Sequence, residues 1–211
     1  MSALSPLQEA VVVGDWDKAA ELTKQGVKSG GDPQAIICGE LQPAMDIVGE
    51  KFSSGEYFLP DMLMAGRAMT RAMEVLKPLL SDSPVSSLGK VVIGTVKGDV
   101  HDIGKNMVIM FLKGTGFEVT DLGSDIPDEK FVQAVREEKP DILGMSALLT
   151  TTMPNLSSTI KALQAAGLRQ NVKVVIGGAP VTQDYADQVG ADAYGHDAGQ
   201  AAQICKTLLQ S

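Results

Sequence analysis

Between residues 90 and 211, five short runs rich in β-branched residues alternate with segments of helical spacing, and this alternation limits the fold more than any other feature. The strand-like runs are Val91–Val96, Phe117–Leu122, Asp141–Ser146, Val172–Ile176 and Ala191–Tyr194. The helical segments lie near Asp102–Gly114, after Pro127, before Gly167, near Gln183–Val189 and at Ala201–Leu209. Because parallel strands need long crossover connections, this alternation predicts an α/β fold with helices on both faces of a parallel sheet.

Five strands in this arrangement fit the flavodoxin-like strand order 2-1-3-4-5. In such sheets a ligand lies beyond the carboxyl ends of the strands, at the switch point between strands 1 and 3. We therefore expect the functional residues in the segments Lys97–Asn106, Ser146–Met153 and Ile176–Val181.

The first 80 residues contain helical patterns only. A capping-box pattern at Ser5 begins a helix that ends near Val13, and a second helix runs from Trp16 to the pair Gly30-Gly31. A third helix is expected from Asp32-Pro33 to Ser53 and a fourth from Leu59 to Leu80. Amphipathic helices with short joints predict an antiparallel four-helix bundle. The expected domains are thus a helical domain at 1–80, a polar linker at 81–89 and an α/β domain at 90–211.

Charge and composition exclude several classes of partner. A formal net charge of −8 and an aromatic content of 4% argue against nucleic acid, which is bound through basic and stacking side chains. The apolar runs are too short to span a membrane, and the N-terminus shows no secretory signal. The two cysteines, Cys38 and Cys205, lack metal-ligand spacing and are expected to be reduced thiols of a cytoplasmic protein.

The loop after the first strand, Lys97–Asn106, excludes the common ligand sites. It is not a phosphate-binding loop, because its glycine spacing is one residue too long and it carries Asp99 and Asp102 where an anion would bind. Zinc is excluded because the chain has two histidines and no paired cysteines. A phosphoacceptor receiver domain needs a carboxylate at the end of the third strand, where this chain has Ser146-Ala147-Leu148.

What remains is one histidine, His101, with a carboxylate, Asp99, two residues before it. A metal-bound imidazole usually donates its other ring N–H to a carboxylate. A single protein ligand is sufficient when the metal brings a macrocycle with it. Haem satisfies that condition in principle, although nothing else in the sequence indicates it.

Three motifs at the ends of strands 1, 3 and 4 resemble the signature of cobalamin-binding domains: Asp99-x-His101-x-x-Gly104, Ser146-x-Leu148 and Gly177-Gly178. Gly49-Glu-Lys-Phe52 and Gly55-Glu-Tyr-Phe-Leu-Pro60 look like that family's helical cap. By this pattern the chain is similar to the small corrinoid proteins of methanogens and acetogens and to the cobalamin module of methionine synthase.

The resemblance implies a base-off, His-on corrinoid whose cobalt has His101 as its lower ligand. The cofactor tail would insert between strands 1 and 3, where Gly104 leaves room and Ser146, Leu148 and Thr150 line the channel. The family's histidine–aspartate–hydroxyl relay maps onto His101, Asp99 and Thr152, with threonine in place of serine. The other cofactor-binding residues implied are Val100, Asp102 and Ile103 in the loop, Gly177 and Gly178 at the nucleotide, and Tyr57, Phe58, Leu59 and Met62 over the upper face.

The function implied is that of a methyl carrier cycling between Co(I) and methyl-Co(III), a non-catalytic subunit of a methyltransferase system. Its partners would be a substrate-specific demethylating methyltransferase, a second methyltransferase with tetrahydrofolate or coenzyme M as acceptor, and a reductive activase. A B12-dependent sensor would need a signalling module, and the small subunit of an adenosylcobalamin mutase would need a barrel partner. The sensor is disfavoured because the chain begins directly with the cap and ends with the closing helix, and the mutase subunit is disfavoured by the four-helix cap.

Overall fold

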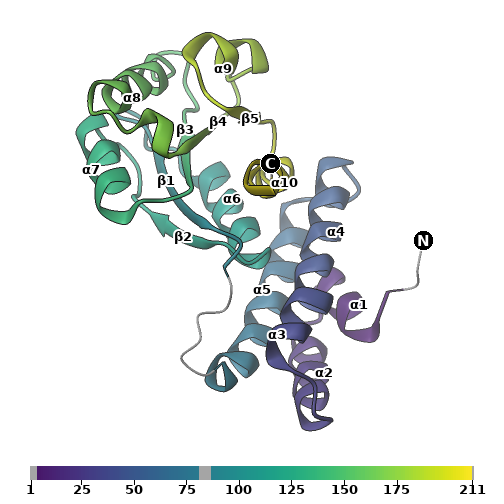
Figure 1. Cartoon of the computed structure of the whole chain (residues 1–211). Helices are drawn as coiled ribbons and strands as arrows, with labels where there is room; N and C mark the ends of the chain where they lie inside the picture. The colour runs from purple at the N-terminus through teal and green to yellow at the C-terminus, as the bar shows by residue number, and fades with distance from the viewer. Residues whose placement is uncertain (1–3, 81–86, 211) are drawn as a thin grey trace. The chain divides into compact units, whose positions relative to one another are not determined.

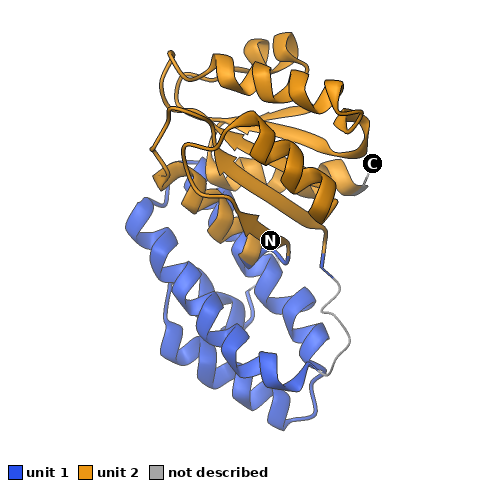
Figure 2. Ribbon diagram, turned by 90° about the vertical axis from the view of Figure 1, so that its left-hand side faces the viewer, with its two compact units in different colours: residues 1–87, 114–116 blue, residues 88–113, 117–211 orange. Residues whose placement is uncertain are grey.

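The computed structural model describes residues 4–80 and 87–210. The chain divides into two units, one of residues 1–87 with 114–116 and the other of residues 88–113 with 117–211 (Figure 2). Most of the expected linker 81–89, namely residues 81–86, lies outside the described residues.

The first unit is helical. Its α-helices are α1 (Pro6–Val12), α2 (Trp16–Lys28), α3 (Pro33–Ile36), α4 (Gln42–Ser53) and α5 (Leu59–Leu76). Ser5 forms the expected capping box with Gln8, and α2 packs along α5. The core of this unit contains fully buried side chains from these helices, among them Val11, Met45, Met62 and Leu76, and Leu41 from the turn between α3 and α4.

Two helix boundaries differ from the sequence-based expectation, and a proline accompanies each. The helix expected from Asp32-Pro33 to Ser53 contains a π-helical turn, Ile37–Leu41, in which the Gln42 N–H donates to the Ile37 carbonyl five residues back. Pro43 follows directly, and its missing N–H removes a bond that a regular α-helix would make. The fourth helix ends at Leu76 and continues as a 3-10 turn, Lys77–Leu79, because Pro78 cannot extend the α-helical ladder.

The second unit is a five-stranded parallel sheet. Its strands are β1 (Lys90–Thr95), β2 (Glu118–Asp121), β3 (Ile142–Ser146), β4 (Lys173–Gly177) and β5 (Ala193–Gly195). The strand order is β2-β1-β3-β4-β5 and every pairing is parallel, which confirms the flavodoxin-like order. The near-continuous burial of β1 and β3 explains why these strands appear in the sequence as unbroken apolar runs.

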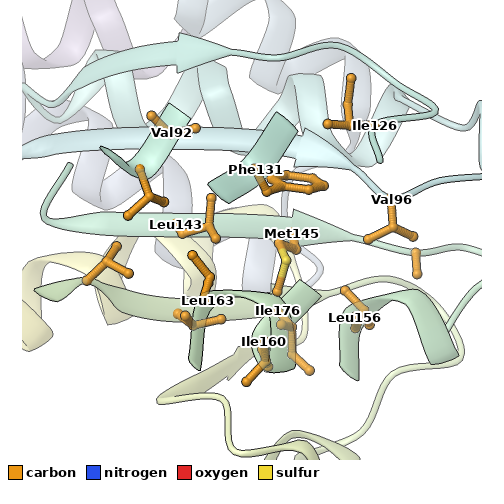
Figure 3. Close-up of a cluster of buried hydrophobic side chains, with 14 of the residues drawn as sticks. Val92, Val96, Ile126, Phe131, Leu143, Met145, Leu156, Ile160, Leu163 and Ile176 are labelled. Carbon is orange, nitrogen blue, oxygen red and sulfur yellow. The ribbon is translucent and has the colours of Figure 1, made fainter. Parts of the chain in front are cut away.

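Helices cover both faces of this sheet (Figure 1). They are α6 (Ile103–Gly114), α7 (Asp128–Glu138), α8 (Pro154–Ala165), α9 (Gln183–Val189) and α10 (Ala198–Gln210), with a 3-10 turn at Arg169–Asn171. On one face, Phe131 of α7 and Leu156 and Ile160 of α8 pack against Leu143 and Ile176 of the central strands (Figure 3). This rigid, buried core holds the carboxyl ends of β1 and β3 side by side.

Candidate functional site

The loops after β1 and β3 meet at the carboxyl edge of the sheet. Thr95, the last residue of β1, pairs with Ser146, the last residue of β3, and Ser146 in turn pairs with Gly177 at the end of β4. The three segments singled out in the sequence therefore start from adjacent positions, at the switch point of the sheet.

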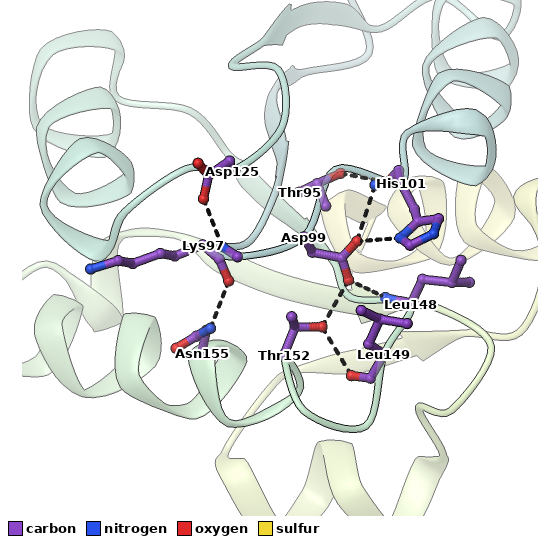
Figure 4. A network of polar contacts seen from close by, with 10 residues as sticks. Thr95, Lys97, Asp99, His101, Asp125, Leu148, Leu149, Thr152 and Asn155 are labelled. Carbon is purple, nitrogen blue, oxygen red and sulfur yellow. Dashed lines mark hydrogen bonds and ion pairs between the residues drawn. The ribbon is translucent and has the colours of Figure 1, made fainter.

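Asp99 is the centre of the polar network at this edge (Figure 4). Its side chain is fully buried. One carboxylate oxygen, Oδ1, lies 2.8 Å from Nδ1 of His101 and accepts the His101 backbone N–H at 3.0 Å. The other, Oδ2, accepts the Leu148 backbone N–H and the Thr152 hydroxyl, both at 2.7 Å. The structure thus brings together His101, Asp99 and Thr152, the three residues of the expected relay.

These hydrogen bonds keep Asp99 ionised. Burial of the carboxyl by itself would raise its pKa, but the hydrogen bonds from His101, Leu148 and Thr152 outweigh burial and hold the pKa well below its usual range. Because an ionised carboxylate only accepts hydrogen bonds, the proton of the neutral imidazole is assigned to Nδ1.

The opposite ring nitrogen of His101 is available to a ligand. The His101 side chain is 47% exposed, and within residues 4–80 and 87–210 nothing hydrogen-bonds to Nε2. A neutral imidazole protonated at Nδ1 carries its lone pair on Nε2, the form that binds a metal. The described residues contain no group of three or more His, Cys, Asp or Glu side chains that could hold a metal ion. A metal at His101 must therefore bring most of its ligands with it.

The surroundings of His101 are apolar and open, which suits a large macrocycle. The side chains of Val100 and Ile103 are each 70% exposed, and those of Leu148 and Leu149 are also exposed. Thr150 is exposed, while Asp102 and Ser146 are half-buried. Exposed aliphatic side chains gathered around one polar centre are typical of a binding surface.

The glycines of the three motifs differ in what they do for the fold. A Cβ on Gly104 would meet nothing within 4 Å, so the protein itself does not require glycine there. That space fits the expected role of Gly104 in admitting the cofactor tail. Gly178, by contrast, has φ +132° and a Cβ on it would lie 1.8 Å from the Ala147 carbonyl oxygen, so the fold itself requires this glycine. Gly177 is half-buried beside it.

The four expected cap residues all belong to the first unit and do not share one environment. Phe58 is 67% exposed and Leu59 is also exposed, at the start of α5. Tyr57 is half-buried and its hydroxyl donates to the Val12 carbonyl at 3.1 Å. Met62 is fully buried in the helical core. Two residues not singled out for the cap, Leu63 and Met64, are exposed on the same helix.

Two contributions to the network were missed in the sequence. Leu148 was expected to line the channel for the cofactor tail, and its backbone N–H in addition donates to Asp99. The Thr95 hydroxyl donates to the His101 carbonyl at 3.1 Å and so holds the loop from the end of β1. A hydroxyl residue closing an otherwise aliphatic strand, as in Val91–Thr95, was the one local signal available for Thr95.

Comparison with known proteins agrees with this geometry. A family model described as B12 binding domain matches residues 89–203, and a second model with the same description matches residues 4–77. Trimethylamine corrinoid protein 1 of Methanosarcina acetivorans is 43% identical over 208 residues, covering 98% of this chain and 96% of that protein. Dimethylamine corrinoid protein 1 of the same organism is 48% identical over 179 residues, covering 84% of each chain.

A solved structure described as a novel cobalamin-binding protein from Desulfitobacterium hafniense is also similar, with 38% identity, a TM-score of 0.83 and coverage of 96% of each chain. The helices that the structure describes include none long and apolar enough to cross a membrane. Matches to both halves of the chain and relatives above 30% identity over nearly its full length show the family. The chain belongs to the B12-binding corrinoid proteins, as its three motifs predicted.

Proposed function

We propose that this chain carries a methyl group on a bound corrinoid between two methyltransferases. The observation that carries the proposal is the arrangement at His101, where a buried, ionised carboxylate holds Nδ1 of a half-exposed imidazole whose neighbours along the chain are exposed aliphatic side chains. When bound, the corrinoid supplies a cobalt centre that accepts and donates a methyl group, cycling between Co(I) and methyl-Co(III). The chain itself supplies binding, ligation and protection, and the partners supply the substrate chemistry.

In this proposal His101 is the lower cobalt ligand and the cofactor is bound base-off. Asp99 orients the imidazole through the 2.8 Å contact with Nδ1. Val100, Asp102 and Ile103 border the ligand, while Gly104, Ser146, Leu148 and Thr150 accommodate the displaced tail. Gly177 and Gly178 lie next to the nucleotide.

Thr152 completes the histidine–aspartate–hydroxyl relay. A second proton on the imidazole occupies Nε2 and leaves no lone pair for cobalt, so taking up and releasing the lower ligand is coupled to that proton. Asp99 stays a carboxylate throughout and stabilises the imidazolium through its contact with Nδ1, while the Thr152 hydroxyl stabilises the carboxylate at Oδ2. The hydroxyl also lies 2.9 Å from the Leu149 carbonyl, so it can donate its single proton to either acceptor.

The first unit is proposed to shield the reactive upper face of the corrinoid. Phe58 and Leu59 offer exposed apolar side chains for this, and Tyr57 and Met62 support them from within the unit. An apolar cover excludes water and competing electrophiles from a reactive centre. It must also open for partners, which are a demethylating methyltransferase, a methyltransferase to tetrahydrofolate or coenzyme M, and a reductive activase.

The similarity to the trimethylamine and dimethylamine corrinoid proteins, at 43% and 48% identity, supports a methylated amine as the methyl donor. A structure of the methanol:cobalamin methyltransferase complex MtaBC from Methanosarcina barkeri is less similar in sequence, with 33% identity and a TM-score of 0.85 over 98% of this chain and 79% of that chain. It supports a pairing of this chain with a substrate-specific methyltransferase.

A visible spectrum tests the proposal. The purified protein is incubated with hydroxocobalamin, desalted and compared with the His101→Ala variant treated in the same way. Wild type should retain corrin bands, and the variant should show shifted bands or lose the corrinoid. Reduction followed by iodomethane should then give the methylcobalt spectrum in wild type. If wild type retains no corrin under reconstituting conditions, the proposed function is wrong.

A further inference from the structure

The segment from Asp121, the last residue of β2, to Pro127 contacts the start of the loop that carries His101 and, through Lys105, the first turn of α6 that follows this loop. At its first end, Asp121 accepts two hydrogen bonds from Nζ of Lys105, at 2.7 and 2.8 Å. Lys105 is only 2% exposed, and its Nζ also donates to Asn106 at 2.9 Å. Asp121 Oδ1 accepts the Gly123 backbone N–H at 2.9 Å, which fixes the carboxylate itself.

At its second end, Asp125 holds the start of the loop (Figure 4). Its Oδ1 accepts the Gly98 backbone N–H at 2.7 Å, and its own N–H donates to the Asp99 carbonyl at 2.9 Å. Asp125 therefore binds the residue before Asp99 and the backbone of Asp99 as well.

Each contact involves a residue in an energetically unfavourable state: a positive φ at Asp125 and a buried charge at Lys105. Asp125 has φ +57°, and within the described residues only one other non-glycine residue, Lys139, has a positive φ. A left-handed backbone costs free energy outside glycine, and a buried lysine needs its charge compensated by close partners. Such costs are retained where a specific geometry has to be held. Here the loop held between the two contacts contains Asp99, His101 and Gly104.

We propose that Asp121 and Asp125 are positioning residues that hold the His101 loop in its cobalt-binding geometry before the corrinoid arrives. They act through the backbone of Gly98 and Asp99 at one end and through Lys105 at the other. Among the described residues, neither hydrogen-bonds to the His101 side chain. This inference rests on the proposed function, because it concerns the ligation by His101.

The test uses a matched pair at Asp125. Asp125→Gly removes the carboxylate that accepts the Gly98 N–H but adopts positive φ without strain. Asp125→Asn keeps an oxygen acceptor and a residue type that tolerates this backbone conformation. The full-length proteins are labelled with 15N-histidine, loaded with cob(II)alamin and measured by electron paramagnetic resonance, in which an axial histidine nitrogen splits the cobalt signal. The rate of corrinoid loss on dilution is measured in parallel.

We expect Asp125→Gly to lose corrinoid about three to ten times faster than wild type, as suits one hydrogen bond, and to show a smaller 15N-coupled fraction. Asp125→Asn should restore both. A merely structural role would lower the melting temperature without changing the coupled fraction. If Asp125→Gly does not fold by circular dichroism, Asp121→Ala replaces it, with Asp121→Asn as its control.

Failure of the proposed function and failure of the positioning role give different results. Wild-type protein without corrinoid or without 15N coupling would overturn the proposed function. Wild-type coupling that is unchanged in a folded Asp125→Gly variant, with the same rate of corrinoid loss, would overturn the positioning role alone.

Discussion

The two units of this protein offer the same kind of surface for different physical reasons. In the α/β unit, exposed aliphatic side chains such as Val100 and Ile103 surround a buried, fully hydrogen-bonded carboxylate. In the helical unit, Phe58, Leu59, Leu63 and Met64 are exposed over a core that is apolar. The parallel sheet brings three loops to one edge, so that donors from distant positions can meet at Asp99. A single helix, by contrast, brings together only those of its own side chains that lie three or four residues apart on one face. The contrast teaches that the α/β unit gathers polar donors from distant positions around one buried carboxylate, whereas the exposed residues of the helical unit surround no such polar centre, and the proposed roles of ligation and apolar cover follow this difference.

The largest effect should follow from Asp99→Asn. The amide cannot accept all four hydrogen bonds that the carboxylate accepts, and its NH2 group faces other donors. We expect a loss of about 3 kcal/mol in the free energy of unfolding, since hydrogen bonds to a charged group are among the stronger ones. Urea denaturation of the apoprotein measures it. If Asp99→Asn lowers the free energy of unfolding by no more than an exposed substitution in the helical unit does, the contrast between a buried polar centre in one unit and an apolar surface in the other is wrong.

Lowering the pH should reduce the contribution of the Asp99 carboxylate to stability. The pKa of Asp99 is lowered from its ordinary value of 3.8, so its contribution to stability is complete above that value and is lost as the pH falls below it. The difference in unfolding free energy between wild type and Asp99→Asn should therefore shrink as the pH falls below about 4. Using the difference removes the titration of the other carboxylates. A difference that grows as the pH falls below about 4 would contradict the assignment.

A smaller effect is expected at Thr152. Thr152→Val removes the hydroxyl but keeps the branched shape, and should cost about 1–2 kcal/mol because Asp99 loses one donor. Thr152→Ser keeps the donor and should restore most of that free energy. Thermal unfolding of the three proteins, with the visible spectrum of each after reconstitution, checks the order. Equal stability of the valine and serine variants would show that the hydroxyl does not support the carboxylate.

The smallest effect on stability should come from the helical unit. Phe58→Ala removes a side chain that is 67% exposed, so the free energy of unfolding should change by no more than about 0.5 kcal/mol. The spectrum of the bound corrinoid should keep its histidine-ligated form. The reduced cofactor should nevertheless be oxidised faster by air, because an apolar cover is lost. Leu63→Ala removes a second exposed side chain of the same helix and serves as a second test. If neither variant changes the oxidation rate, the proposed role of the helical unit as an apolar cover is wrong.

Much of the molecule could be predicted from sequence. The five strands, their order and the helix starts at Ser5 and Asp32 were predicted because apolar periodicity and capping are local properties. The pairing of Asp99 with His101 was also local, since two residues of separation place both in one loop. The three motifs at the strand ends were sufficient to predict the family.

Tertiary structure alone decided the rest. The family resemblance named Thr152 as a relay residue, but it lies 53 positions from Asp99, and the 2.7 Å bond between them exists because β1 and β3 pair in register. The contacts of Asp125 with the His101 loop, and the burial of Met62 among the helices, likewise depend on packing between distant segments. The sequence by itself determined which elements form and which edge of the sheet carries the chemistry. Which donors reach the carboxylate depended on how those elements pack, because a hydrogen bond across the chain requires positions that no local pattern encodes.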